Sequence, residues 1–459
     1  MDERPAVRGI WMFSIICLGQ LVTMLGSSIT AFALGIWVYQ RTGSATQFGL
    51  IAFCGVLPGI LLSPLAGALV DRWNHRWTMI LSDFGAGLIT LAIFLLLGTG
   101  RFEVWHIYVL SALSSTFRAF QGPAYIAATS LLVPKQHLGR AGGMVQMEQS
   151  IVQLAAPALG GLLLEIIQLQ SILLLDMAAC LFALVTLLSV HIPRAATPVG
   201  EPDKGSLLHE IAYGWTYLTS QPGLLGLLMF FAVSNFLGGI VGVLFGPLVL
   251  SFASPSAFGT LLSIAGIGML IGSLVMSVWG GPQRRMHAVF SVMLLIGLCI
   301  LIAGSAPSIL VVGIATFLAY VGTPILNACT QVIFQEKAAP SVQGRIFAIT
   351  GAVAGAALPL AYLVAGPLAD YVFEPLMVPD GRLAESVGQL IGVGPGRGIG
   401  LMFMIMGALT MIVTVVAYFY PRLRLVEDEL PDRIPDDKVF SETEPVPQPL
   451  IAPQIRKMR

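Results

Sequence analysis

The chain has 459 residues, of which 56% are hydrophobic and only 10% are charged, and its mean hydropathy is +0.85. Soluble domains carry roughly 25% charged residues, so this composition argues against an ordinary soluble protein and points to lipid as the solvent. The 24 basic and 24 acidic residues cancel, which leaves no whole-protein argument for a nucleic-acid partner.

Long apolar segments run through the whole chain. A membrane-spanning helix needs about 20 mostly apolar residues, and twelve segments meet this condition. The first six are 10–38, 47–70, 77–98, 104–132, 142–166 and 171–191. The second six are 223–250, 256–279, 286–304, 307–334, 346–370 and 398–420. We therefore expect an all-α membrane protein with twelve transmembrane helices, arranged as two six-helix pseudo-repeats.

The basic residues orient these spans. Twelve spans place both termini on one side, and nineteen of the Lys and Arg residues fall on that side. The opposite side holds only Arg41, Arg101, Arg382 and Arg397. Basic residues are enriched in cytoplasmic loops, so both termini are expected in the cytoplasm. The first apolar run has no signal-peptidase site, so the first span is expected to be retained.

Four regions follow from this count. They are an N-terminal half at 1–192, a cytoplasmic linker at 193–222, a C-terminal half at 223–422 and a disordered tail at 423–459. In the linker, an interfacial helix is expected because apolar residues share one helical face: Leu207, Leu208, Ile211, Trp215 and Leu218. The halves resemble each other, as in Phe48-Gly49 and Phe258-Gly259, which suggests parallel repeats around a midplane cavity.

The turn between the second and third spans reads GALVDRWNHRW and contains Gly67, Asp71, Arg72 and Arg76. It resembles the signature G-x-L-x-D-R-x-G-R-[RK] of the major facilitator superfamily, although Asn74 stands where glycine is usual. The resemblance implies a gate that closes the cytoplasmic side, with Gly67 permitting close helix approach and the arginines pairing across the two halves. The alternative is a basic loop that only fixes orientation.

The fourth span contains a second match to this family, RAFQGPA, with Arg118, Gln121 and Gly122 in the pattern R-x-x-Q-G. An arginine at the bilayer centre costs about 2.5–3.5 kcal/mol on insertion scales, so Arg118 should face a polar cavity and have a partner. The resemblance implies a role in proton coupling. The alternative is a structural arginine paired with backbone carbonyls.

A third match lies in the fifth span, where Pro157, Gly160 and Gly161 resemble the G-P-x-x-G-G element of exporters in the family. Val152 and Ala156 replace its upstream glycines. Proline bends a helix and paired glycines allow close packing, so an ordinary kinked helix is the alternative. Within the family, the chain resembles the branch of macrolide-efflux and enterobactin-exporter proteins, which implies export.

Ionisable residues inside spans are functional candidates. Besides Arg118, they are Asp83, Glu148 and Asp176. Many drug/proton antiporters of the family have an acid in the first helix, and residues 10–38 contain none. Glu148 is the preferred proton-binding site because it shares a polar stretch with Gln146 and Gln149. Asp83 could instead stabilise the gate, and Asp176 could be a structural cap or pair.

A hydrophobic substrate requires aromatic and small polar groups in a largely apolar pocket. The candidates are Gln20, Phe117, Gln153, Asn235, Phe236, Tyr320 and Asn327. No P-loop, HExxH or GxSxG motif occurs, and no CxxC pair is present among the five cysteines. We therefore expect no enzyme activity, no cofactor and no metal site.

Together these features predict a bacterial inner-membrane secondary transporter. It is expected to export an amphipathic drug, siderophore or peptide-like metabolite in exchange for protons, by alternating access of the two halves. Its expected partners are the small-molecule substrate, protons and the lipid bilayer, with no nucleic acid, and it is expected to act as a monomer. An importer or symporter of the same fold, and a non-transporting membrane receptor, remain alternatives.

Overall fold

The computed structural model describes residues 3–70, 72–134, 137–190, 216, 219, 221–282, 284–337 and 343–429. Within these ranges all regular structure is helical, and twelve helices are longer than twenty residues. The first half contains α1 (Glu3–Thr42), α2 (Ala45–Val70), α3 (His75–Gly98), α4 (Val104–Leu132), α5 (Leu138–Ile166) and α6 (Leu169–Ser189). The second contains α8 (Pro222–Leu250), α9 (Pro255–Trp279), α10 (Arg285–Ser305), α11 (Ile309–Lys337), α12 (Gln343–Leu368) and α15 (Arg397–Phe419).

These helices confirm the predicted all-α membrane architecture. Each predicted span coincides with one long helix, although α1 begins at Glu3 rather than near residue 10. Eleven helices in the described part are long and apolar enough to cross a membrane by length and composition. The remaining long helix is α4, whose polar residues include Arg118 and Gln121.

Short helices complete the C-terminal half. The segment between α12 and α15 contains the π-helix η2 (Ala369–Phe373), α13 (Glu374–Leu376) and α14 (Gly388–Ile391), and α15 is followed by α16 (Pro421–Arg424) and α17 (Val426–Glu429). Disorder was expected from residue 423, yet Leu423 and Val426 are fully or almost fully buried. The described helices therefore extend to Glu429, into the segment predicted as disordered. The rest of the predicted tail, and most of the linker with its predicted interfacial helix, fall outside the described residues.

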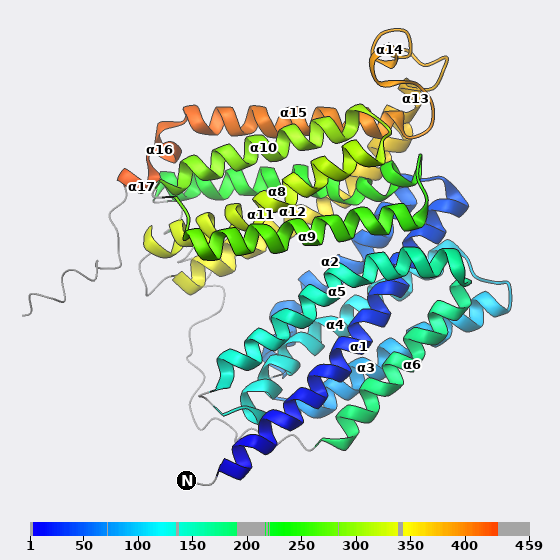
Figure 1. The fold of residues 1–459 in the computed structure, drawn as a ribbon, viewed down its shortest axis with the longest axis vertical. Helices are drawn as coiled ribbons and strands as arrows, with labels where there is room; N and C mark the ends of the chain where they lie inside the picture. The colour runs from blue at the N-terminus through cyan, green and yellow to red at the C-terminus, as the bar shows by residue number, and fades with distance from the viewer. Residues whose placement is uncertain are drawn as a thin grey trace, which may run out of the picture.

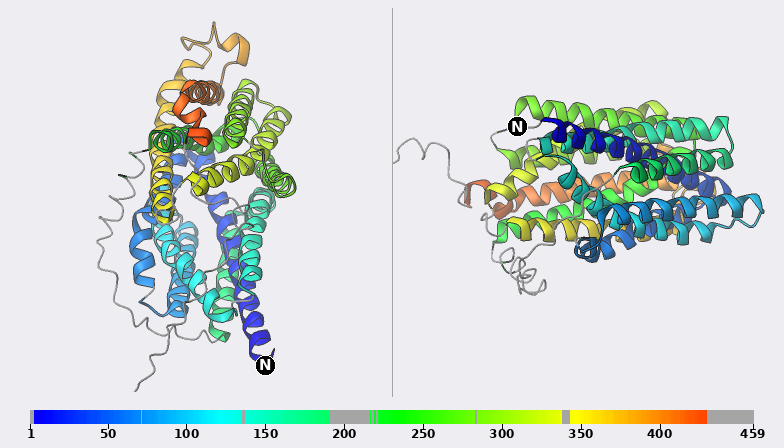
Figure 2. Two further views of the ribbon diagram at one scale, coloured as in Figure 1. Left: turned by 90° about the vertical axis from the view of Figure 1, so that its left-hand side faces the viewer. Right: turned by 90° about the horizontal axis from the view of Figure 1, so that it is seen from below.

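The helices form two bundles, α1–α6 and α8–α15, which Figure 1 shows in blue to teal and in green to orange. The bundles meet at the end opposite the N-terminus and α17, and diverge toward the end where those elements lie. We name these the far end and the terminal end. The left view of Figure 2, which faces the terminal end, shows the second-half helices nearly end-on above the first-half bundle. Contacts between the halves come mainly from α2 with α12 and from α5 with α9.

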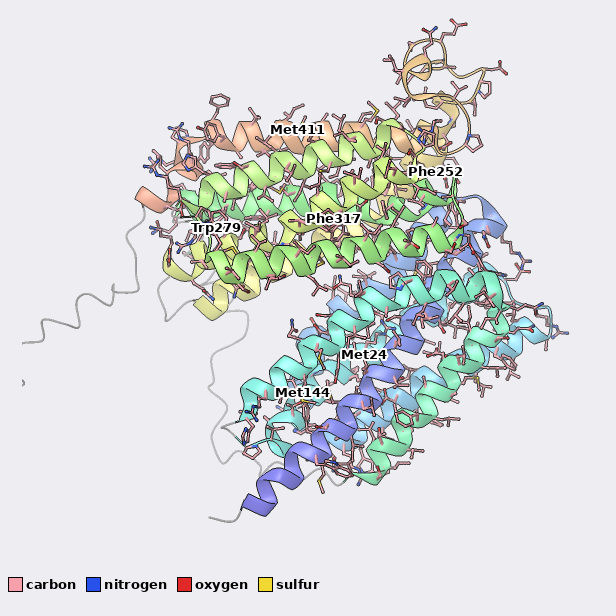
Figure 3. The ribbon with its side chains drawn as sticks, in the orientation of Figure 1. Met24, Met144, Phe252, Trp279, Phe317 and Met411 are labelled. Atoms are coloured by element: carbon pink, nitrogen blue, oxygen red, sulfur yellow. The ribbon has the colours of Figure 1, made fainter. Side chains whose placement is uncertain are left out.

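Each bundle has its own apolar core, and apolar side chains also cover the outer faces. Phe13, Ile16 and Met79 are buried in the first half, and Leu224 and Phe403 in the second. Figure 3 shows side chains projecting from every face of the helices, including Trp279 at the end of α9, which is 57% exposed. Water would disfavour such exposed apolar surface, whereas lipid accommodates it.

Candidate functional site

A network of three polar side chains lies inside the first half. The Nε2 amide of Gln20 on α1 donates to Oδ2 of Asp83 on α3 at 2.9 Å. The Nε2 amide of Gln121 on α4 donates to Oδ1 of Asp83 at 2.5 Å and to Oε1 of Gln20 at 2.8 Å. Asp83 and Gln20 are each only 2% exposed. Both oxygens of the Asp83 carboxylate therefore have donors, and three helices are linked through one acid.

Glu148 forms a second buried polar contact in the first half. It lies on α5, is 2% exposed, and accepts a hydrogen bond from the phenol of Tyr125 on α4 at 2.8 Å through Oε1. Its Oε2 has no hydrogen-bond partner within the described residues, and Cys17 of α1 lies close to it. A buried carboxylate oxygen without a donor is costly.

Asp176 on α6 lies near Arg118. Its Oδ1 accepts from the hydroxyl of Ser27 at 3.1 Å and its Oδ2 from that of Thr90 at 2.8 Å. Asp176 is electrostatically coupled to Arg118 on α4, but no ion pair closer than 4.0 Å joins them in the described structure. The Arg118 side chain instead faces open cavity space. Arg118 was predicted to face a polar cavity and to have a partner; it lines two cavities, and its role stays a prediction.

Two cavities of the first half are lined by these charged and polar side chains. One, of about 260 Å³, is lined by residues that include Asp83, Gln121, Tyr125 and Glu148. The other, of about 330 Å³, lies toward the far end and includes Asp176 in its lining. Arg118, Ser27, Ala86 and Ser114 line both. Asp83, Arg118, Glu148 and Asp176 therefore line two neighbouring cavities that share part of their lining.

The second half contains a cavity of a different chemical character. It has a volume of about 540 Å³ and is lined from α8, α11 and α12 by residues that include Asn235, Asn327, Thr330 and Gln331, with no charged residue among its lining residues. Asn327 and Gln331 are one helical turn apart, and both side chains are exposed. The amide of Asn235 donates to the Phe231 carbonyl at 2.8 Å. This surface offers neutral hydrogen-bonding groups beside apolar ones.

The predicted substrate residues do not form a single cluster. Gln20 and Phe117 line the 260 Å³ cavity of the first half, and Asn235 and Asn327 line that of the second. Gln153 and Tyr320 line a cavity of about 290 Å³ between the halves. Phe236 packs against the apolar core of the second half and lines none of these four cavities. The Gln20 amide already donates a hydrogen bond to the Asp83 carboxylate.

The predicted gate turn is described only in part, because Asp71 lies outside the described residues. Arg72 is exposed. Arg76 donates from Nε and Nη2 to the carbonyls of Leu187 and Leu188 at 3.2 and 2.7 Å, so it binds the C-terminal end of α6 in its own half. Among the described residues, no atom lies within contact of a Cβ built at Gly67. The close approach expected at Gly67 and the pairing of Arg76 across the halves are therefore absent from this conformation.

The predicted exporter element lies where the halves meet. A Cβ on Gly160 would press on the ring of Phe32 of α1, and one on Gly161 would collide with the backbone at Pro255, which begins α9. A Cβ on Gly259 of α9 would likewise collide with the carbonyl oxygen of Pro157. The small residues are thus required by packing here, both within the first half and against the second. Gly122, in contrast, has no neighbour that a Cβ would meet.

Several partners in this site were not predicted from the sequence. Tyr125, Ser27 and Thr90 each donate to a buried carboxylate. Tyr125 follows Arg118 by seven residues, two helical turns, so it lies on the same face of α4 and could have been found from the sequence. Among the described residues, no group of three His, Cys, Asp or Glu side chains is arranged to hold a metal ion.

Comparison with known proteins identifies the class. The family profile "Major Facilitator Superfamily" matches residues 16–362, so the chain belongs to this superfamily of membrane transporters. It is 27% identical over 369 residues to macrolide efflux protein A of Streptococcus pyogenes, covering 78% of this chain and 90% of that protein. It is 24% identical over 419 residues to the multidrug efflux pump Tap of Mycolicibacterium fortuitum, covering 89% of this chain and 96% of that protein.

Solved structures agree on the fold. A bacterial homologue of the human lysosomal transporter Spinster, in an inward-facing and unoccupied conformation, superposes with a TM-score of 0.69 at 12% identity, covering 92% of this chain and 98% of that one. The nucleoside transporter NupG gives a TM-score of 0.63 at 11% identity, covering 88% and 98%. The protein is thus a multi-pass transporter of the major facilitator fold, with relatives named as efflux pumps.

Proposed function

We propose that this protein exports an amphipathic small molecule from the bacterial cytoplasm across the plasma membrane in exchange for protons, by alternating access of its two halves. The observation that carries the proposal is the segregation of charge. Four charged residues, Asp83, Arg118, Glu148 and Asp176, line the two cavities of the first half. The 540 Å³ cavity of the second half is lined by neutral groups.

The first half supplies the coupling groups in this proposal. Glu148 binds the proton, because one of its buried oxygens has no donor among the described residues and a protonated carboxyl tolerates burial better than a carboxylate. Arg118 lies between Asp176 and the cavity that contains Glu148. It acts on Asp176 through its positive charge, which is weakly screened inside the protein. Asp83, with Gln20 and Gln121, holds α1, α3 and α4 in register around this site.

The second half supplies the neutral substrate surface. Asn235, Asn327 and Gln331 can hydrogen-bond polar groups of a substrate, and Phe231 and Phe334 offer apolar contact in the same cavity. Gln153 and Tyr320 extend this surface into the space between the halves. Largely apolar pockets with a few fixed polar groups suit amphipathic ligands. The names of the relatives, macrolide efflux protein and multidrug efflux pump, support export of such molecules.

The terminal end is the cytoplasmic end in this proposal, because basic residues gather there. The turn with Gly67, Asp71, Arg72 and Arg76 then closes that end when the transporter opens outward. The proposed transporter is a monomer, since substrate and coupling groups all come from one chain.

Everted membrane vesicles provide the test. With a radiolabelled macrolide as probe, an imposed proton gradient should drive uptake into vesicles that contain the protein, and an uncoupler should abolish it. Glu148→Gln should remove gradient-driven uptake and leave downhill movement of the probe. Glu385→Gln, at an exposed position of the far-end loop, is the matched control and should behave as wild type.

Three results would contradict the proposal. Gradient-independent uptake would rule out proton antiport. Accumulation only in right-side-out vesicles would indicate import. Normal gradient-driven uptake by Glu148→Gln would exclude Glu148 as the coupling acid.

A further inference from the structure

The far end holds a carboxylate that crosses from the second half to the first. Asp370 of η2 accepts from the backbone N–H groups of Ala45 and Thr46 at 3.0 and 2.8 Å. It also accepts from the hydroxyl of Ser44 at 2.6 Å. These residues form the N-terminal end of α2, where backbone N–H groups lack partners within the helix. Asp370 thus caps a helix of the opposite half.

An equivalent contact runs in the opposite direction. Glu165, at the end of α5 in the first half, accepts from the backbone N–H of Ser256 at 3.0 Å. Ser256 lies in the first turn of α9, a helix of the second half. Each half therefore extends one carboxylate to a helix N-terminus of the other, and a negative charge is stabilising at that position.

Each acid is preceded, at a distance of four residues, by a glycine on the same helical face. A Cβ on Gly366 would collide with the backbone of Thr46, and a Cβ on Gly161 would collide with that of Pro255. The spacing G-x-x-x-[DE] occurs as GLLLE at 161–165 and as GPLAD at 366–370. The glycine lets the neighbouring helix end approach closely enough for the acid to reach it.

The symmetry extends one turn further. The carbonyl of Tyr362, four residues before Gly366, faces Gly49 of α2, and the carbonyl of Pro157, four residues before Gly161, faces Gly259 of α9. Gly49 and Gly259 belong to the repeated Phe-Gly pairs of the two halves. The two contacts are therefore related by the internal repeat.

We propose that Glu165 and Asp370 form a reciprocal latch that holds the far end closed and must release before the transporter opens there. The latch positions the two halves, and it is independent of the substrate and of the coupling ion. When the halves separate at the far end, both helix N-termini lose their carboxylate together. The latch therefore favours the present conformation over one open at the far end.

Access to the space behind the latch provides the measurement. Ser28 lines the cavity between the halves, so Ser28→Cys is a reporter for a membrane-impermeant maleimide added from the far side. Cys54, which is partly exposed, is replaced by alanine in the background. Losing a helix cap costs typically about 1 kcal/mol, or about fivefold in an equilibrium. Glu165→Ala and Asp370→Ala should each speed labelling about fivefold, and the double variant about 25-fold if the two caps act independently.

A matched double variant, Asp380→Ala with Glu385→Ala, removes two exposed acids from the loop at the same end and should label at the wild-type rate. Gly366→Ala keeps both carboxylates but forces α2 away from α12, so it too should speed labelling. Gly55→Ala on α2, where a Cβ meets open space, should not.

Three outcomes would overturn the latch. In the first, the folded double alanine variant is labelled at the wild-type rate. In the second, the Asp380/Glu385 control shows an equal increase in labelling rate. In the third, Gly366→Ala is labelled at the wild-type rate. If the double variant does not purify as a monodisperse protein, the comparison of Gly366→Ala with Gly55→Ala decides. Because labelling requires no substrate, these results are independent of the outcome of the transport assay.

Discussion

The buried acids of the first half are satisfied mainly by neutral donors. Asp83 binds two glutamine amides, Asp176 binds two hydroxyls, and Glu148 binds one phenol. Arg118 interacts electrostatically with Asp176 but makes no ion pair closer than 4.0 Å in the described part of the chain. Neutral donors stabilise a carboxylate without neutralising it, so these acids can still respond to a proton or to a bound ligand.

The Asp83 network provides a test at the scale of the single residue. In Asp83→Asn, an amide NH₂ group would face the NH₂ groups of Gln20 or Gln121, leaving buried donors unpaired. Such groups cost about 1–3 kcal/mol each, so we expect a lower thermal unfolding temperature in detergent. Asp380→Asn, on the exposed loop, should leave it unchanged. An Asp83→Asn protein as stable as wild type would show that the network does not hold the three helices together.

At the scale of the element, glycine determines how closely the helices pack. Gly297 and Gly304 of α10 face Gly407 and Gly400 of α15, and each would direct an added Cβ at the backbone of the opposing helix. In lipid, helix association depends on such close contact rather than on the hydrophobic effect. The start of α10 is also capped by Glu427 of α17, which accepts from the N–H groups of Arg285 and Met286, both at 3.0 Å.

Gly304→Ala tests this packing. The added methyl group would collide with the Gly400 carbonyl, and overpacking of this kind typically costs about 1–3 kcal/mol. We expect a lower unfolding temperature, and a normal one for Gly238→Ala, where a Cβ on α8 meets open space. Equal stability of the two variants would contradict close α10–α15 packing.

At the scale of the whole molecule, the two bundles meet at the far end and diverge at the terminal end (Figure 1). The hydrogen bonds of Asp370 and Glu165 lie at the far end, and the contact of Gln153 with Met269 lies nearer the middle. The neutral cavity of the second half is formed by the parts of α8, α11 and α12 on the terminal side of the midpoint. This arrangement places the cavity on the terminal side of the second half.

Thiol labelling in oriented vesicles tests that arrangement. Asn327→Cys, at an exposed position in the cavity, should react with an impermeant maleimide in inside-out vesicles and not in right-side-out ones. Asp380→Cys, on the far-end loop, should show the reverse. Labelling of both cysteines from the same face would contradict the proposed orientation or the conformation.

The sequence was most informative where function depends on positions within one helix. Arg118, Gln121 and Gly122 fall on one face of α4 because they are three and four residues apart. Partners from other helices could not be assigned. Gln20 and Asp83 are 63 residues apart in the chain, and nothing in either segment specifies which face of α1 meets α3. Phe236 was predicted to bind substrate, and it packs against the apolar core of the second half.

The sequence by itself determined the twelve spans, their division into two halves and the family, because apolar length and local spacing are properties of single segments. The tertiary structure decided which end is closed, which acids share a cavity, and that Glu165 and Asp370 reach across to the opposite half. Ser44 and Asp370 are 326 residues apart. Their contact exists only in one relative position of the two bundles, and that position is set by packing between them.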